Sequence, residues 1–375
     1  MLIGCVINDT TIIMNLIKSN PFRGMNRILT LCFVAVMSLS IVSCDDDDNK
    51  PSGQYADGFF VVNEGSFGSG NGTVTHFSDA KVATQDLFGL VYSGRALGDV
   101  VQSMTIEDNV GFIVVNNSKK VEVVTASTFE SLYTIDGLAL PRYVTVDGDL
   151  AYITEWVSFT DDGRVSVVDL NTHQVIDKIA AGSGAENILE HDDLLYVSNS
   201  FTNTVSVIDR NDRKSIKTIT VSDSPGELLL DANGKIWVIC GGSFGGNDGA
   251  LVEIDPSKSR KSADESVVKT IELSLNPGYH KGAISPDGRS LFYFQGKNVY
   301  KFDVSATSAP ASALITESTA TSFYGIGIDP RTKLLYVADD RGFAGAGTVF
   351  RYELSGQTVD NFAAGIGPNS FAFHD

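Results

Sequence analysis

A short pattern of hydrophobic and polar positions recurs along the chain: an aromatic or β-branched residue, then apolar and small polar residues. The seven copies are Phe60-Val61-Val62-Asn63, Ile113-Val114-Val115-Asn116, Tyr152-Ile153-Thr154-Glu155, Tyr196-Val197-Ser198-Asn199, Trp237-Val238-Ile239-Cys240, Phe292-Tyr293-Phe294-Gln295 and Tyr336-Val337-Ala338-Asp339. Their spacings are 53, 39, 44, 41, 55 and 44 residues. A four-stranded propeller blade has this period.

Strands of other types follow each copy. A strand that alternates apolar and polar residues comes next, as in Thr204–Asp209 and Arg164–Asp169. A third strand such as 215–221 and a Pro- or Gly-led strand such as 225–231 complete the unit. Alternation at period two is the mark of β-structure, and no segment longer than a turn has a helical pattern.

The two ends of the chain decide the architecture. The first strand, from Phe59, has the repeated pattern. The last strand, Pro368-Asn369-Ser370-Phe371-Ala372-Phe373, has the Pro-led pattern. The last strand is therefore expected to complete the blade that the first strand begins. We predict an all-β fold over residues 57–375: a seven-bladed β-propeller in which the N- and C-terminal strands close one blade.

Two segments resemble the YVTN-type repeats of YncE-like propellers: Leu195-Tyr196-Val197-Ser198-Asn199 and Leu335-Tyr336-Val337-Ala338-Asp339. The resemblance covers roughly residues 57–375 and implies the fold. It implies little about activity, because propellers host many unrelated functions. Function is expected in the loops rather than in the strands.

The N-terminal region has the features of an export signal. Met25-Asn26-Arg27 precedes an apolar run over 28–42, which is too short to span a membrane, and then Ser43-Cys44 and four aspartates. The segment Ile41-Val42-Ser43-Cys44 resembles the lipobox of bacterial lipoproteins, whose cysteine is acylated. We expect 1–24 to precede the true start, 25–43 to be the signal peptide, Cys44 to carry lipid, and 44–56 to be a flexible acidic tether. An ordinary signal peptide with a chance cysteine is the alternative.

Composition narrows the function classes. The 375 residues are 43% hydrophobic and include 28 Lys and Arg against 46 Asp and Glu, a formal net charge of −18. This composition gives a folded core, and the charge argues against a nucleic-acid partner, which needs clustered cations. Of four cysteines only Cys240 lies in the predicted propeller, so no disulfide is expected there.

The starts of the innermost strands should converge on the propeller axis. They bring donors and acceptors together, the composition of a small-molecule site; a water-filled polar channel is the alternative. The candidate binding residues here are Arg142, Tyr143, Asn187, Glu227, His280, Lys281, Tyr324 and Asn369. Arg142, Tyr143 and His280 rank first because each has a planar group with directed donors.

Aromatic residues recur in the loops that follow the repeated strands. They are Phe67, Trp156, Phe159, Phe201, Phe244 and Phe343. A phenylalanine in a Gly-rich polar loop either packs back or contacts a ligand, so these residues are expected to form an apolar rim on one face. The alternative is that each Phe closes the top of its own blade.

Motifs for catalysis or cofactors lack the required context. Gly241-Gly242-Ser243-Phe244-Gly245 matches G-x-S-x-G, but another strand follows where a nucleophile elbow needs a helix. The histidines show no pair at metal-ligand spacing. We therefore expect neither a cofactor nor a bound metal, and no enzymatic activity.

The segment 63–72, Asn-Glu-Gly-Ser-Phe-Gly-Ser-Gly-Asn-Gly, and the repeat plan resemble the cobalamin-capturing surface lipoproteins of the BtuG type. The resemblance implies an outer-membrane lipoprotein at the cell surface that binds a corrinoid without covalent bonds and passes it to a TonB-dependent transporter. In that case the aromatic rim covers the corrin and Arg142, Tyr143, Asn187 and Asn369 reach its amides. Two alternatives remain: a lactonase-like hydrolase using Glu186, Glu227, His280 or Lys281, and a platform that binds proteins.

Overall fold

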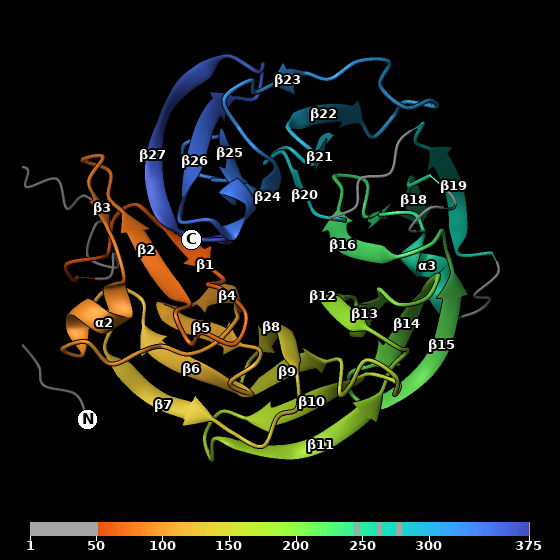
Figure 1. The fold of residues 1–375 in the computed structure, drawn as a ribbon. Helices are drawn as coiled ribbons and strands as arrows, with labels where there is room; N and C mark the ends of the chain where they lie inside the picture. The colour runs from red at the N-terminus through yellow and green to blue at the C-terminus, as the bar shows by residue number, and fades with distance from the viewer. Residues whose placement is uncertain (1–51, 244–245, 247, 261–264, 275–279, 375) are drawn as a thin grey trace, which may run out of the picture. The chain divides into compact units, whose positions relative to one another are not determined.

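In the computed structural model, residues 52–243, 246, 248–260, 265–274 and 280–374 are described. Within these residues, the strands pair into seven antiparallel sheets of four strands each. Figure 1 shows the sheets arranged as blades around a central axis. The predicted seven-bladed propeller is thereby confirmed. The predicted signal segment, Cys44 and Phe244 lie outside the described residues.

Each blade has the same order of strands from the axis outward. The innermost strands are β4 (Val101–Glu107), β8 (Pro141–Asp147), β12 (Ala185–His191), β16 (Pro225–Leu230), β20 (Gly282–Ile284), β24 (Phe323–Ile328) and β28 (Pro368–Phe373). The second strands are β5 (Val110–Val115), β9 (Leu150–Glu155), β13 (Leu194–Asn199), β17 (Ile236–Cys240), β21 (Ser290–Gln295), β25 (Leu334–Asp339) and β1 (Phe59–Asn63). The repeated sequence pattern therefore marks the second strand of every blade.

The third and outermost strands complete the blades. The third strands are β6 (Lys120–Thr125), β10 (Arg164–Asp169), β14 (Thr204–Asp209), β18 (Ala250–Ile254), β22 (Asn298–Asp303), β26 (Ala346–Glu353) and β2 (Thr73–Phe77). The outermost strands are β7 (Ser131–Ile135), β11 (Gln174–Ala180), β15 (Lys214–Thr220), β19 (Val267–Glu272), β23 (Ile315–Thr316), β27 (Thr358–Ile366) and β3 (Ala83–Thr84).

Short helices lie between strands: α2 (Leu87–Val91), α3 (Pro256–Ser259) and the 3₁₀ turn η3 (Arg341–Phe343). The sequence pattern missed α2, because five residues are too few to show a helical period. Leu87 and Phe88 are buried, so α2 covers the blade whose outer strand β3 has only two residues. None of the helices in the described ranges has the length and apolar character that a membrane crossing needs.

The ends of the propeller meet in one blade. Strand β28 pairs with β1, Phe59 opposite Phe373 and Val61 opposite Phe371, so the last strand completes the first blade as predicted. The packed part of the chain begins earlier than the predicted boundary at residue 57. Tyr55 is 4% exposed, and its carbonyl oxygen lies 2.9 Å from His374 Nε2.

Hydrophobic cores fill the spaces between neighbouring blades. Strands β13 and β17 are buried at every residue because they face a blade on each side, which explains their nearly continuous apolar sequence. The closing blade has the same arrangement. Phe60 packs in one core with Ile113, and Phe59 packs in another with Tyr336.

The outermost strands of several blades contain a β-bulge at an equivalent position. In five blades the register shifts by one residue between the third and the outermost strand, and the extra residue is an exposed aliphatic. These residues are Leu132, Ile176, Ile216, Val268 and Val359. A bulge twists an edge strand and interrupts its hydrogen-bond ladder, so these outer edges are poor templates for pairing with another chain.

Phe59 packs against rings on both sides of the closure, and its ring lies 4.5 Å from that of Tyr336 and 5.6 Å from that of Phe373. We expect Phe59→Ala to lower the free energy of unfolding by about 3–5 kcal/mol, because it leaves a cavity between the first and last blades. Phe67→Ala is the matched control, since Phe67 is 77% exposed and its loss should cost less than about 0.5 kcal/mol. Urea denaturation measures both, and equal losses would contradict this role of Phe59.

Candidate functional site

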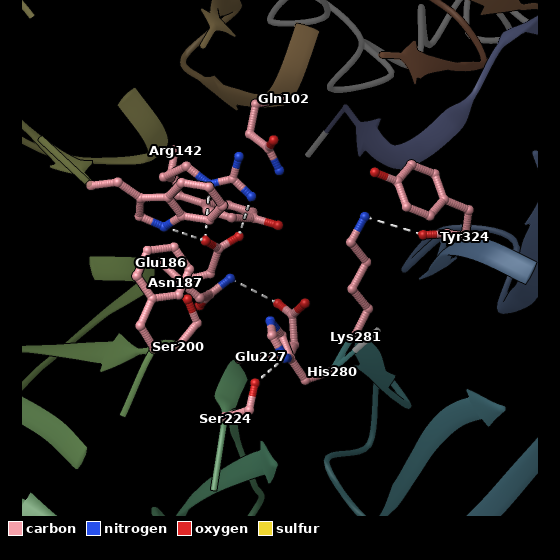
Figure 2. A pocket seen from close by; sticks show the side chains of 14 residues that line it. Gln102, Arg142, Glu186, Asn187, Ser200, Ser224, Glu227, His280, Lys281 and Tyr324 are labelled. Atoms are coloured by element: carbon pink, nitrogen blue, oxygen red, sulfur yellow. Dashed lines mark hydrogen bonds and ion pairs between the residues drawn. The ribbon is translucent and has the colours of Figure 1, made fainter. Parts of the chain in front are cut away.

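A cavity of about 290 Å³ opens where the innermost strands begin (Figure 2). Its lining residues come from those strand starts and from the loops after β9 and β13. They are Gln102, Arg142, Tyr143, Trp156, Glu186, Asn187, Ser200, Phe201, Ser224, Gly226, Glu227, His280, Lys281 and Tyr324. We call this cavity the hub.

Bulges place most of these side chains on the axis. In the pairing of β8 with β9, the register shifts between Pro141 and Val144, which leaves Arg142 and Tyr143 outside the regular ladder. The same shift in β12 falls at Glu186 and Asn187. Equivalent shifts put Gln102, Glu227 and Tyr324 at the hub. A further shift falls at Asn369.

The repeated sequence motif supports these bulges through its small polar residue. A bulge leaves backbone N–H groups without a ladder partner, and buried N–H groups need one. The Tyr143 N–H donates to Thr154 Oγ1 at 3.0 Å, and the Asn187 N–H donates to Ser198 Oγ at 3.1 Å. Thr154 and Ser198 are the third residues of their motifs, so this position holds the hub strands in shape.

The final residue of the motif fixes the loop that enters the innermost strand of the same blade. Asn199 Oδ1 accepts a hydrogen bond from the Gly182 N–H at 3.0 Å, and Asn63 Oδ1 accepts one from the Gly365 N–H at 2.9 Å. Asp339 accepts from two backbone N–H groups of the equivalent loop. The repeat therefore encodes the geometry of the hub as well as the blade.

One wall of the hub is a buried ion pair. Arg142 donates twice to Glu186, from Nε at 2.9 Å and from Nη2 at 2.7 Å, and both side chains are at most 12% exposed. Trp156 Nε1 donates to the same carboxylate at 2.8 Å, and the guanidinium carbon lies 3.9 Å from the centre of the Trp156 ring. Burial by itself lowers the pKa of Arg142, but the charge and hydrogen bonds of Glu186, with smaller contributions from Tyr143 and Tyr324, together raise it. Arg142 is thus a fixed, neutralised cation.

The loop that carries Trp156 is strained. Val157 has φ of 65°, and the Ser158 N–H donates to the Trp156 carbonyl at 2.8 Å, which makes a γ-turn of the rare positive-φ type. Positive φ is a true outlier for a β-branched residue, and such strain gathers at functional sites. The turn sends Trp156 into the hub.

Three aromatic side chains form a cluster beside the hub, which we call the aromatic wall. The Trp156 ring lies 4.7 Å from that of Phe201 and 5.7 Å from that of Phe159. Phe159 is 72% exposed and Phe201 is 42% exposed. Exposed aromatic residues at the mouth of a polar cavity are typical of ligand contacts.

The predicted apolar rim is therefore confined to one side. Phe343 packs away from the wall, with its ring 5.3 Å from that of Tyr324. Phe67 lies on a loop held by Asp99, and among the described residues it has no ring contact. The sequence could not separate these roles, because each Phe occupies a similar Gly-rich loop.

The opposite wall carries Lys281 and Tyr324. The Lys281 ammonium donates to the carbonyls of Tyr324 at 3.1 Å and Asn369 at 2.9 Å, and it lies 4.5 Å from the centre of the Tyr324 ring. The Tyr324 hydroxyl donates a short hydrogen bond to Glu64. Burial lowers the pKa of Lys281 to about 8, although the charges of Glu64 and Glu186 oppose that shift.

The floor of the hub holds Glu227 and His280. Glu227 Oε1 accepts a hydrogen bond from Asn187 Nδ2 at 3.0 Å, and His280 Nδ1 lies 3.1 Å from Ser224 Oγ. Burial raises the pKa of Glu227 to about 7, against the opposing charge of Lys281. Burial lowers the pKa of His280, so the imidazole is neutral at pH 7. Burial and the charge of Glu186 raise the pKa of Tyr143.

The side chain of Asn369 does not lie where a ligand-binding role predicts. Its side chain is fully buried, and its Nδ2 donates to the carbonyls of Val101 and Gln102, both at 3.1 Å. The amide therefore ties β28 to the neighbouring blade and does not line the hub. A bulge can turn a side chain toward the axis or into the blade interface, and sequence position does not distinguish these two directions.

Several lining residues were absent from the predicted binding set. Gln102 and Glu186 stand at predicted hub positions, and Glu186 turns out to organise Arg142 and Trp156. Ser200 and Ser224 also line the hub, and a single serine in a loop gives no sequence signal of its own. Glu64 reaches the hub through Tyr324, and only its neighbourhood in the segment 63–72 marked it in the sequence.

The fold and hub define a seven-bladed β-propeller with a polar cavity at one end of its axis. Residues 57–364 match the family described as a domain of unknown function, DUF5074, and the chain belongs to that family.

Solved structures share the fold at low sequence identity. The periplasmic gluconolactonase PpgL of Pseudomonas aeruginosa is 15% identical with a TM-score of 0.61, covering 83% of this chain and 97% of that one. A quinonprotein alcohol dehydrogenase-like protein of Bacteroides thetaiotaomicron is 14% identical with a TM-score of 0.63, covering 84% and 78%. These similarities concern the fold alone.

One curated relative is antigen Lp49 of Leptospira interrogans, which is 25% identical over 142 residues. The match covers 36% of this chain and 31% of the antigen, so the chain spans about a third of that relative.

The raised pKa of Glu227 predicts a pH-dependent stability. The folded protein keeps this proton up to about pH 7, whereas the unfolded chain releases it near the ordinary value of 4.5, so stability falls as the pH rises between these values. We expect Glu227→Gln to be more stable than wild type by about 1 kcal/mol at pH 8 and equal to it at pH 4, since the carboxyl faces an open cavity.

Urea denaturation at both pH values measures the difference. Glu130→Gln is the control, because Glu130 is an exposed residue just before β7 and does not line the hub. A gain of the same size at pH 4 and pH 8 would show that Glu227 keeps an ordinary pKa.

Proposed function

We propose that this protein captures a small molecule without covalent chemistry, with the aromatic wall as its apolar contact and the hub as its polar contact. The observation that carries the proposal is the exposure of Phe159 and Phe201 beside a cavity whose donors and acceptors are already held in place. Preorganised polar groups lose little entropy on binding, and an exposed aromatic cluster gains most from being covered.

The ligand that we propose is a corrinoid such as cobalamin. The resemblance of the segment 63–72 and of the repeat plan to cobalamin-capturing lipoproteins supports this choice. A corrin is larger than a cavity of about 290 Å³, so the macrocycle would lie over the aromatic wall. One of its polar side arms would enter the hub, where Asn187 and Gln102 offer both donors and acceptors.

We further propose that the protein is anchored in the outer membrane by lipid on Cys44, faces the cell surface, and hands its ligand to a TonB-dependent transporter. The lipobox-like segment 41–44 and the acidic residues after it support the anchor. A tether between anchor and propeller leaves the propeller free to deliver a ligand to a neighbouring transporter.

Isothermal titration with cyanocobalamin tests the ligand. We expect Phe201→Ala and Trp156→Ala each to weaken binding by roughly tenfold or more, because they remove part of the aromatic wall. Leu132→Ala is the matched control, since Leu132 is 51% exposed on the outer strand β7 and should leave the affinity unchanged. Saturating ligand should also raise the midpoint of thermal unfolding. Absence of heat and of a midpoint shift would refute the corrinoid.

Cell fractionation tests the anchor. Cys44→Ala should move the protein from the membrane fraction to the soluble fraction, because the only lipid attachment is lost. Cys240→Ala is the control; Cys240 is buried in β17 and its loss should leave the protein in the membrane fraction. A Cys44→Ala protein that stays in the membrane would contradict a lipid anchor at this residue.

A second candidate function is hydrolysis of a lactone. The raised pKa of Glu227, together with the shared fold of a gluconolactonase, favours this alternative, because a carboxyl that titrates near pH 7 can act as a general base. Turnover of gluconolactone that Glu227→Gln abolishes, combined with no binding of cyanocobalamin, would replace the capture function with this one.

A further inference from the structure

Lys281 differs from the other charged residues of the hub in its partners. Arg142 and Glu186 neutralise each other, Glu64 accepts a hydrogen bond from Tyr324, and Glu227 accepts one from Asn187. The Lys281 ammonium contacts two backbone carbonyls, and among the described residues no carboxylate oxygen lies within 4.0 Å of it. It is a half-buried cation without a paired anion in the described part of the chain.

The two carbonyls fix the direction of the ammonium. An ammonium group has three N–H donors, and the carbonyls of Tyr324 and Asn369 take two of them. Figure 2 shows the Lys281 nitrogen facing the open space of the hub, across from Gln102 and Arg142. The third donor is therefore available to a molecule in the cavity.

The far side of the cavity offers further donors. The Arg142 Nε and Nη2 atoms bind Glu186, and Nη1 makes no hydrogen bond within the described part of the chain. The Gln102 side chain, which lines the same cavity, adds an amide. Charges withdrawn from water in proteins are normally paired, and a lone half-buried cation among donors fits an anion that arrives with the ligand.

We propose that the hub binds an anionic group, a carboxylate or a phosphate, with Lys281 as its counter-ion and Arg142 Nη1 and Gln102 as additional donors. This inference rests on the proposed binding function and specifies the part of the ligand that enters the hub. It applies equally to a small organic acid and to a larger ligand that carries an acidic arm.

The charges around Lys281 predict how such binding depends on pH. The groups that face it are Glu64, Glu186, Glu227, Asp340, Arg142, His280 and Tyr324. Between pH 6 and pH 9 Lys281, with a pKa of about 8, loses its charge, and Glu227, with a pKa of about 7, becomes negative. Both changes disfavour an anion in the hub, so the affinity should fall across this range.

Isothermal titration with sodium gluconate and with sodium phosphate, at constant ionic strength in chloride, tests the proposal. We expect at least one anion to bind wild type at pH 6, with affinity reduced at least tenfold in Lys281→Met and at pH 9. Lys281→Arg keeps the charge and should retain binding. Comparison of the two anions distinguishes a carboxylate from a phosphate as the preferred group.

Lys301→Met is the matched control. Lys301 also lies over an aromatic ring, 5.4 Å from the centre of Phe292, and contacts a backbone carbonyl, but it lines a different cavity. This variant should bind the anion like wild type. Circular dichroism and the unliganded melting midpoint show whether each variant folds.

The outcomes separate this inference from the proposed function. Equal anion binding by wild type and Lys281→Met, or no anion binding by wild type at pH 6, overturns the role of Lys281. Cyanocobalamin binding that persists in that case leaves the capture function standing. Anion binding that requires Lys281, without any binding of cyanocobalamin, supports the inference and refutes the corrinoid.

Discussion

The pairing of β28 with β1 is the constraint on which the rest of this structure depends. Antiparallel hydrogen bonds between the last and first strands turn seven separate sheets into a closed ring. Phe59, at the edge of that pairing, packs against rings from the last blade and from β28. Without this pairing the first blade would lack its innermost strand, and β1 would present an unpaired edge. Closure also forces the innermost strands toward one axis, and that convergence creates the hub.

Convergence brings polar residues close together, and the bulges and ion pairs make this arrangement stable. Side chains displaced from the strand ladder point at the axis, while Thr154 and Ser198 satisfy the backbone groups that the bulges release. Glu186 neutralises Arg142 and orients Trp156 beside it. The aromatic wall and the uncompensated ammonium of Lys281 therefore lie on a rigid frame, which suits binding more than it suits a conformational switch.

The fold could be predicted because the same physical demand recurs in every blade. A second strand that is buried on both faces needs an apolar sequence, so the repeat could be recognised. The first strand of the chain has the pattern of a second strand and the last has the pattern of an innermost strand, so the closure could be predicted as well. The hub positions of Arg142, Tyr143, Glu227 and Lys281 followed from their places at strand starts. Two features could not be predicted: the turn of Asn369 into the blade interface, and the grouping of Trp156 with Phe159 and Phe201. Both depend on local backbone geometry, such as the positive φ of Val157 beside Trp156.

The most direct test of the central claim is a crystal structure of the protein grown with saturating cyanocobalamin. We expect electron density for the corrin over Trp156 and Phe201, with a polar side arm of the ligand inside the hub. Density for the corrin on another surface, or a hub that contains only ordered water at saturating ligand, would contradict it.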